Sequence, residues 1–417
     1  MDRIKNFFKK LGPGIITGAS DDDPSGIATY SIAGAKSQYS LLWTAFLTFP
    51  LMVSVQEMVA RIGLVTGKGL AGNIREHYPK LFLYFVSFLT IVAITINIGA
   101  DISGMAASIK LIIPIPTPIL ALSVTALVII LLVYFDYKTI AKNLKWLTFT
   151  LFAYILAAFI TRPDWPDIMK NTFLPQIAAN PGNISLIVAI FGTTISPYLF
   201  FWQASEEVEE KEAAGQIQST RQIQIVTKHE LKGMREDVAL GMLFSNIVMF
   251  SIIATVASTL YPAGIHDIQT ADQAAQALKP LAGTAASFLF AAGIVGTGLL
   301  AIPVLAGAAA YAVSESFGWS LGLSKRFHEA KSFYLVIIAA TLVGFGISIA
   351  GFNPFKILFY TAVIYGLLSP FLIAVILHLA NKKKVMGAKT NGWLSNLGGA
   401  LTFLIMLAAA VALFVVK

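Results

Sequence analysis

Long apolar segments alternate with short polar segments along the whole chain. A helix that crosses a bilayer needs about 20 predominantly apolar residues, and longer segments can tilt or break. Eleven segments meet this length: 12–34, 40–64, 82–109, 114–135, 143–161, 183–203, 237–260, 285–313, 332–351, 355–380 and 393–416. The pattern predicts an all-α polytopic membrane protein that forms a single transmembrane domain over 1–417.

The first apolar segment is interrupted by its most polar stretch. Residues 17–30 read Thr-Gly-Ala-Ser-Asp-Asp-Asp-Pro-Ser-Gly-Ile-Ala-Thr-Tyr, which places three adjacent carboxylates near mid-bilayer. Each buried charge there is costly and usually functional. Pro24 removes an amide donor and Gly26 lets the backbone turn. We therefore expect the helix to break and to leave the carbonyls of residues 19–22 free beside a carboxylate, which makes a cation site.

A second interruption lies in the sixth apolar segment, where residues 192–198 read Gly-Thr-Thr-Ile-Ser-Pro-Tyr. Pro24 and Pro197 each fall in the first helix of a group of five. Two broken segments at matching positions are typical of inverted-repeat transporters with a midplane site. We therefore expect inverted five-helix repeats over 12–161 and 183–380, with 393–416 as an additional eleventh helix.

Composition agrees with a membrane transporter and excludes other classes. The chain is 56% hydrophobic and 12% charged, which excludes an ordinary soluble domain. The net charge of +8 reflects basic loops on one side, so no nucleic-acid partner is expected. No cysteine is present to form disulfides or thiolate ligands. No nucleophile, base and oxyanion arrangement emerges, so we do not expect an enzyme, a cofactor or an obligate protein partner.

Basic residues also predict the orientation in the membrane. Cytoplasmic loops are enriched in Lys and Arg. With the N-terminus cytoplasmic and the C-terminus extracytoplasmic, the outer segments and the last residue hold few of the 30: Lys36, Lys110, Arg162, Lys170, Lys279, Lys356 and Lys417. The expected location is the plasma (inner) membrane.

The two interruptions offer oxygen and no softer donor. Asp23 supplies a carboxylate, Ser20 and Thr193 supply carbonyls, and Ser196 supplies a hydroxyl. Sulfur and imidazole would favour later transition metals, whereas oxygen favours magnesium, calcium or manganese. Asp22 and the aspartate before it are either outer-shell acceptors or part of an exposed cluster at the unwound end.

Three other polar features allow two interpretations each. Asp101 in the third helix is a functional group or bonds a neighbouring side chain. Glu57 and Arg61, four residues apart, form a helix-end pair or an inner-gate contact. The acidic loop 204–236 is a solvated cytoplasmic helix or gate support, or binds metal through its glutamates. The tenth helix offers interior polar groups at Tyr360, Thr361 and Tyr365.

At these residues the chain resembles the NRAMP family of divalent-metal transporters. The likeness covers most of the chain and includes Gly12-Pro13-Gly14, Asp23-Pro24, Thr66-Gly67-Lys68 and the Pro197 break. It implies a LeuT-type fold of two inverted five-helix repeats with helices 1 and 6 broken. Members of this family move manganese or ferrous iron, usually coupled to protons.

The departures from the family pattern imply a different ion. The family usually has Asp-Pro-Gly-Asn in helix 1, where this chain has Gly26 at the Asn position. It usually has Met-Pro-His in helix 6, where this chain has Ser196 and Tyr198. Gly104 replaces a glutamate three residues after Asp101, and Gln203 replaces a further histidine. The soft sulfur ligand and three groups that could carry protons are thus absent.

These substitutions are similar to those of the NRAMP-related magnesium transporters. The resemblance implies a carrier of partly hydrated Mg²⁺, and of Mn²⁺, without proton coupling, in which Asp23 is the principal ligand, Gly26 gives space and Tyr198 lines the pathway. One alternative is a proton-coupled Mn²⁺/Fe²⁺ transporter that uses Asp101. Another is an amino-acid carrier on the same scaffold, although three aspartates would repel a substrate carboxylate.

Overall fold

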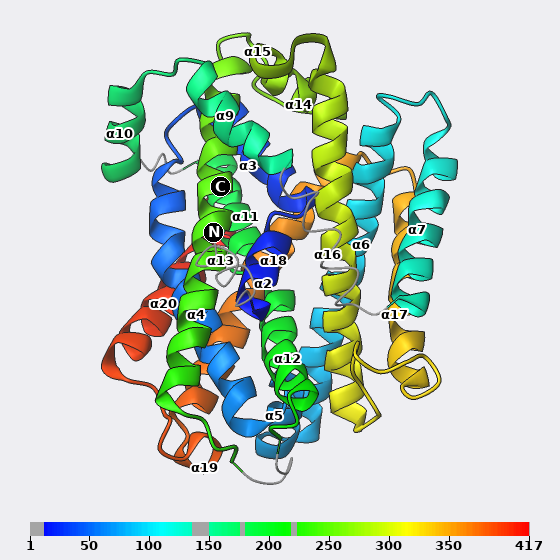
Figure 1. Ribbon diagram of the computed structural model, residues 1–417. Coiled ribbons are helices and arrows are strands. Elements are labelled where there is room, and N and C mark those ends of the chain that lie inside the picture. Colours follow the sequence, from blue (N-terminus) through cyan, green and yellow to red (C-terminus); the bar gives the residue numbers. More distant parts are fainter. Residues whose placement is uncertain (1–11, 136–149, 176–179, 218–222, 417) are drawn as a thin grey trace, which may run out of the picture.

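The computed structural model describes residues 12–135, 150–175, 180–217 and 223–416, and within these ranges it is built from helices without a strand (Figure 1). Nine helical runs in these ranges are long and apolar enough to cross a membrane. They are α4 (Trp43–Thr66), α6 (Lys80–Ile109), α7 (Thr117–Tyr134), the pair α11 (Pro181–Thr194) and α12 (Pro197–Ala213), α13 (Lys228–Thr259), α16 (Ala286–Phe317) with the short turns before it, α17 (Lys331–Ser348), α18 (Pro354–Asn381) and α20 (Trp393–Val415).

The first expected helix is split into α2 (Pro13–Asp21) and α3 (Pro24–Ser37), and the sixth into α11 and α12. Pro24 and Pro197 each stand at the first turn of the half-helix that follows, where a missing amide donor does no harm. The predicted breaks are confirmed, and with them the all-α, LeuT-type class. The division into repeats at 12–161 and 183–380 stays a prediction.

The two broken helices lie at the centre of the bundle. In Figure 1, α3 lies above α2, and α12 runs downward below α11. The half-helices α2 and α3 pack on α13, α11 packs on α18, and α12 packs on α4 and α16. Gly192 permits the close approach of α11 to α18, because a side chain there would collide with the Ala362 carbonyl. The breaks are therefore enclosed on all sides by continuous helices.

Several expected boundaries need correction. The sixth helix continues through α12 to Ala213 rather than ending at 203, and the seventh begins at Lys228 rather than 237. The fifth is seen as α9 (Phe152–Ile160), while the start expected at 143–149 lies outside the described residues. Short helices were not predicted in the connections: α5 (Leu70–His77), α10 (Trp165–Phe173), α14 (Ala271–Ala275), α15 (Lys279–Ala282) and α19 (Lys383–Met386).

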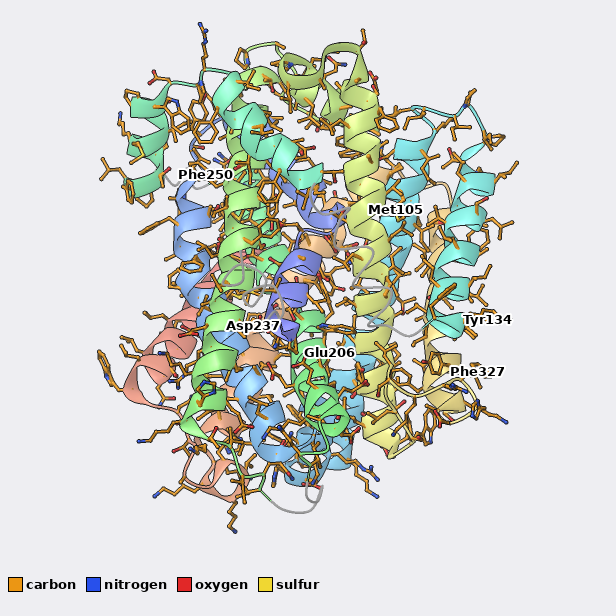
Figure 2. All side chains as sticks on the ribbon, viewed as in Figure 1. Met105, Tyr134, Glu206, Asp237, Phe250 and Phe327 are labelled. Atoms are coloured by element: carbon orange, nitrogen blue, oxygen red, sulfur yellow. The ribbon has the colours of Figure 1, made fainter. Side chains whose placement is uncertain are left out.

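The first part of the acidic segment after residue 203 is helical and buried. Glu206, Glu207 and Glu209 on α12 are each at most 8% exposed, and Figure 2 shows Glu206 inside the lower half of the bundle. Glu209 accepts hydrogen bonds from the backbone N–H groups of Leu323 (2.7 Å) and Ser324 (2.9 Å) and from the Tyr311 hydroxyl. The expectation of a solvated helix is wrong for Glu206, Glu207 and Glu209, whereas most of the described residues from Glu210 to Glu236 are exposed. Glu209 holds a loop in place instead of presenting its oxygens to a metal.

Two further polar expectations can be judged. Glu57 and Arg61 do pair (3.4 Å), but inside α4 rather than at its end, and Arg235 on α13 also bonds Glu57 (2.9 Å). Tyr360 is 60% exposed, so its placement in the interior was wrong, whereas Thr361 and Tyr365 are fully buried.

Candidate metal site

Asp23 occupies the first break as the N-cap of α3. Its Oδ1 accepts hydrogen bonds from the Gly26 N–H and the Ser25 hydroxyl, both at 2.7 Å. Its Oδ2 accepts one from the Asn97 amide on α6 at 2.8 Å. A carboxylate has about four acceptor positions, so three donors fix the orientation of the group and leave Oδ2 able to bind a cation.

Asp101 lies one helical turn from Asn97 on α6. The Asn97 amide is 3.4 Å from Asp101 Oδ2 as well as 2.8 Å from Asp23 Oδ2, so this one side chain joins the two carboxylates. Asp101 Oδ1 and Asn97 Oδ1 are buried without a hydrogen-bond partner. Asp101 therefore belongs to the same polar cluster as Asp23, while its role as a ligand or relay stays a prediction.

The second break meets the first through side chains and backbone. The Tyr198 hydroxyl on α12 donates to the Ser20 carbonyl on α2 at 2.9 Å. A side chain at Gly26 would lie 3.3 Å from Thr193 Oγ1 and 3.2 Å from the Asp21 carbonyl. The Ser196 hydroxyl donates to the Thr193 carbonyl at 2.6 Å. The residues expected to form the site are thus brought together, and their role as metal ligands stays a prediction.

Asp22 lies in the loop between α2 and α3, and its neighbour Asp21 ends α2. Both side chains approach Ser245 on α13, whose hydroxyl is 2.6 Å from Asp21 Oδ2 and 3.4 Å from Asp22 Oδ1. Of the two alternatives for this pair, an exposed cluster is excluded, because neither side chain has any exposed surface.

The whole cluster is closed to solvent and rich in negative charge. The side chains of Ser20, Asp23, Thr193, Ser196, Tyr198 and Asp101 are at most 2% exposed. None of the ion pairs within the described ranges involves Asp21, Asp22, Asp23 or Asp101. Buried carboxylates without a positive partner are strongly unfavourable. The donor set, with several buried oxygens that no hydrogen bond satisfies, fits a cation.

This arrangement differs from a resident metal centre. Across the part of the chain that the structure describes, no three His, Asp or Glu side chains converge as they do around a tightly held metal ion.

Comparison with known proteins identifies the family. Residues 14–416 match the family described as natural resistance-associated macrophage protein-like. The chain belongs to the Nramp family. It is 25% identical to a divalent metal cation transporter of Klebsiella pneumoniae over 95% of this chain and 91% of the relative, and 26% identical to one of Listeria welshimeri over 98% and 91%.

The fold of this Nramp protein is also that of a solved relative. The crystal structure of the Eremococcus coleocola manganese transporter, in complex with an aromatic bis-isothiourea substituted compound, matches with a TM-score of 0.73. The match covers 98% of this chain and 87% of that one at 19% sequence identity. The match covers nearly the whole chain, so this Nramp protein is a multi-pass membrane protein with the architecture expected from its sequence.

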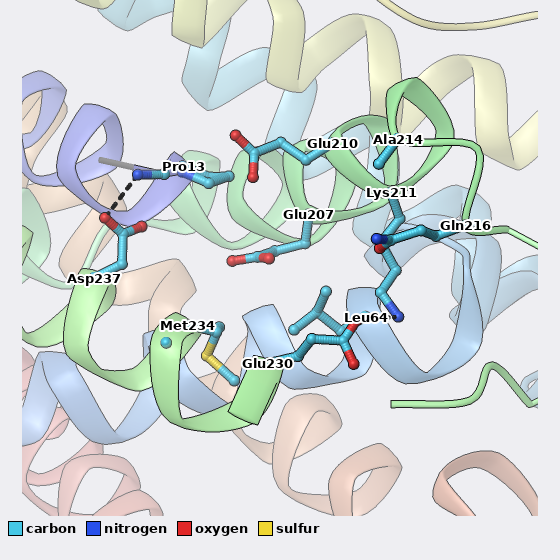
Figure 3. A pocket seen from close by; sticks show the side chains of 12 residues that line it. Pro13, Leu64, Glu207, Glu210, Lys211, Ala214, Gln216, Glu230, Met234 and Asp237 are labelled. Carbon is cyan, nitrogen blue, oxygen red and sulfur yellow. Dashed lines mark hydrogen bonds and ion pairs between the residues drawn. The ribbon is translucent and has the colours of Figure 1, made fainter. Parts of the chain in front are cut away.

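Two cavities flank the closed cluster of this Nramp protein. One, of about 260 Å³, is lined by the start of α2, the end of α12 and the start of α13; we call it the α2 cavity. Figure 3 shows Glu207 and Glu210 pointing from α12 toward Asp237 on α13. The other, of about 460 Å³, is lined by α3, α11 and α18 and contains Lys36, Lys356 and Asp267; we call it the α3 cavity.

Hydrogen bonds run from the middle of α2 to the α2 cavity. Thr17, one turn before Ser20 on α2, donates to the Gln203 side chain, and Gln203 donates to Glu207 at 2.9 Å. Glu207 lines the cavity. Gln203 is a neutral side chain that both accepts and donates in this chain of hydrogen bonds. Gln203, Thr17 and Ser245 were absent from the expected site, because they are ordinary polar residues whose partners lie far away in the sequence.

Proposed function

We propose that this Nramp protein transports a divalent metal cation by alternating access, carrying partly hydrated Mg²⁺, and also Mn²⁺, without coupling to protons. The observation that carries this proposal is that the break between α2 and α3 meets the break between α11 and α12, and that both breaks offer only oxygen atoms as metal ligands. Asp23 supplies the charge, the carbonyls of Ser20 and Thr193 supply dipoles, and Ser196 supplies a hydroxyl.

The choice of ion follows from the chemistry of these donors. The relatives are named divalent metal cation transporters, and the solved relative a manganese transporter, which supports a doubly charged cargo. Neither break of this chain has a thioether or imidazole. Without soft donors the site loses the preference that would rank manganese or iron above magnesium. Mg²⁺ sheds water reluctantly and is commonly bound by one or two carboxylates together with waters.

The absence of proton coupling follows from side chains that do not titrate near neutrality. Gly104 has no side chain, Gln203 is an amide, and Tyr198 donates its hydroxyl proton to the Ser20 carbonyl. A cotransported proton needs a group that binds and releases it along the path. We infer that the electrochemical gradient of the cation alone drives its movement.

In the proposed movement, the half-helices around the site change their tilt. The cluster is closed on both sides, while the α2 and α3 cavities approach it from opposite ends. Tilting of α2 and α12 would open the α2 cavity to the ion, and tilting of α3 and α11 would open the α3 cavity. The basic-residue asymmetry supports an orientation with the α2 cavity on the cytoplasmic side.

A competition assay in proteoliposomes tests this function. Uptake of Mn²⁺ is measured against Mg²⁺ and Ca²⁺ with a pH dye in the lumen. We expect Mg²⁺ to compete, and the lumen to show no acidification during uptake. An Mn²⁺ uptake rate that excess Mg²⁺ does not reduce would contradict the assignment of Mg²⁺ as a transported ion.

A second candidate function is a proton-coupled Mn²⁺/Fe²⁺ carrier. It is favoured by Asp101, a buried carboxylate joined through Asn97 to Asp23, with one oxygen free of any partner. Under this alternative, uptake of Mn²⁺ acidifies the lumen and Asp101→Asn removes that acidification while slow metal flux remains. The same assay therefore separates the two functions.

A further inference from the structure

Two buried carboxylates beside the first break take no part in the site proposed above. The Asp23 side chain is bonded to α3 and α6. The side chains of Asp21 and Asp22 instead approach α13, where Ser245 lies within hydrogen-bonding distance of both. The break therefore carries two separate groups of oxygens, one on each side of the backbone.

The group on the α13 side lacks hydrogen-bond donors. The Ser245 hydroxyl has one proton, so it donates either to Asp21 Oδ2 (2.6 Å) or, less favourably, to Asp22 Oδ1 (3.4 Å). Asp21 Oδ1 and Asp22 Oδ2 are fully buried and have no partner at all. A buried acceptor normally finds a donor, so in their ionised form these two oxygens require another source of positive charge; counting bound ions, as below, separates a bound cation from a bound proton.

The cargo at Asp23 cannot supply that charge alone. Asp23 and Asp101 already bring two carboxylates to the other side of the break. Asp21 and Asp22 add two more, and the ion pairs found in the described ranges give neither of them a basic partner. One divalent ion balances two ionised carboxylates, whereas the break holds four carboxyl groups.

We propose that Asp21, Asp22 and Ser245 form a second divalent-cation site, on the α13 side of the break. The inference deepens the proposed function and rests on it for the class of ion. Two carboxylates and a hydroxyl are hard donors that suit Mg²⁺ or Mn²⁺ with water in the remaining positions. Asp21 is the last residue of α2, so the second ion is bound on the half-helix that leads to the α2 cavity.

Counting bound ions tests this site directly. Purified protein is dialysed to equilibrium against radioactive Mn²⁺, and ions per chain are measured as a function of concentration. We expect two ions for the unmodified chain and one for Asp21→Asn or Asp22→Asn. Ser245→Ala should weaken the second site at least tenfold, because loss of a direct donor should exceed the roughly tenfold effect of losing an outer partner, and should leave the first site unchanged.

The matched control is Ser251→Ala, also on α13, whose hydroxyl bonds the Ile247 carbonyl of its own helix at 2.7 Å. It should leave both sites unaltered. If an aspartate variant fails to fold, Ser245→Ala still decides. Binding of a single ion by the unmodified chain, or two ions with unchanged affinities in Ser245→Ala, would overturn the second site.

Failure of this inference is distinct from failure of the proposed function. Asp23→Ala should lose transport and retain one bound ion. A chain that binds one ion, with transport lost in Asp23→Ala, refutes the second site alone. Normal transport by Asp23→Ala refutes the proposed function, whatever the number of ions bound.

Discussion

The two breaks are alike in backbone and opposite in chemistry. In each, an extended residue precedes a proline at the first turn of a half-helix. At the first break Asp23 accepts hydrogen bonds from its own half-helix and from α6. At the second, Ser196 makes no cap, and its hydroxyl donates to the carbonyls of Gly192 and Thr193. Under the proposed function, the first break supplies charge and the second determines which ion is preferred.

The largest expected effect comes from removing the charge of the first break. Asp23→Ala should reduce uptake of Mg²⁺ and Mn²⁺ more than about 100-fold, because loss of a direct ligand should exceed the effect of losing an outer one. Radioactive or dye-reported uptake into proteoliposomes measures it. Ser25→Ala, which removes only one of the donors to Asp23, serves as the control and should keep most of the flux. Equal uptake by the two variants would contradict the claim that the first break supplies the charge that binds the ion.

A smaller loss should follow from freeing the carboxylate that the first break holds in place. Asn97→Ala removes the donor to Asp23 Oδ2 and to Asp101. Uptake affinity should fall about tenfold, with transport still measurable. Thr95→Val, whose hydroxyl bonds the Ile91 carbonyl of its own helix, should change little. If both variants behave alike, Asn97 is a packing residue.

The second break should alter preference more than rate. Ser196→Met introduces a thioether, so competition by Mn²⁺ and Cd²⁺ should strengthen several-fold relative to Mg²⁺. Ser196→Ala, which removes the hydroxyl without adding sulfur, should not produce this shift. An unchanged ion ranking in Ser196→Met would contradict the argument from donor softness.

The smallest effect concerns how the half-helix α2 is anchored. Asp237 on α13 accepts hydrogen bonds from the N–H groups of Gly12 (2.9 Å) and Gly14 (2.6 Å) at the start of α2. Asp237→Ala should destabilise the protein by about 1–2 kcal/mol, as loss of a helix cap does, and should lower the melting temperature in detergent by roughly 2 °C. The control is Glu236→Gln, at the exposed residue next to Asp237; this variant should have the same melting temperature as the unmodified protein.

The sequence alone allowed both breaks to be predicted, because a proline flanked by polar residues inside an apolar segment interrupts the helix there. The bounds of α4, α6, α7, α16, α17, α18 and α20 also lie within a few residues of those expected. The end of α12 was missed because four glutamates after residue 203 indicated a solvated segment. Three of the four are buried, and the burial of Glu209 depends on Tyr311 and the backbone at Leu323, about a hundred residues away.

Only those site residues could be predicted that lie next to a proline break in the sequence. Asp23 and Ser196 are read directly from the residues beside each proline. Ser245 was not, because a serine in an apolar helix is ordinary until its distance to Asp21, 224 residues away in the chain, is known. The same holds for the bond between Thr17 and Gln203. Contacts between helices, rather than motifs, supply this part of the cluster.

The central claim is that a divalent ion binds where the two breaks meet, on oxygen alone. Anomalous X-ray diffraction from crystals grown with Mn²⁺ tests it most directly. We predict an anomalous peak at coordination distance from the Asp23 carboxylate, between the Ser20 and Thr193 carbonyls. A peak confined to a position away from both breaks would contradict the account, as would Mn²⁺-loaded, actively transporting protein without a peak at Asp23.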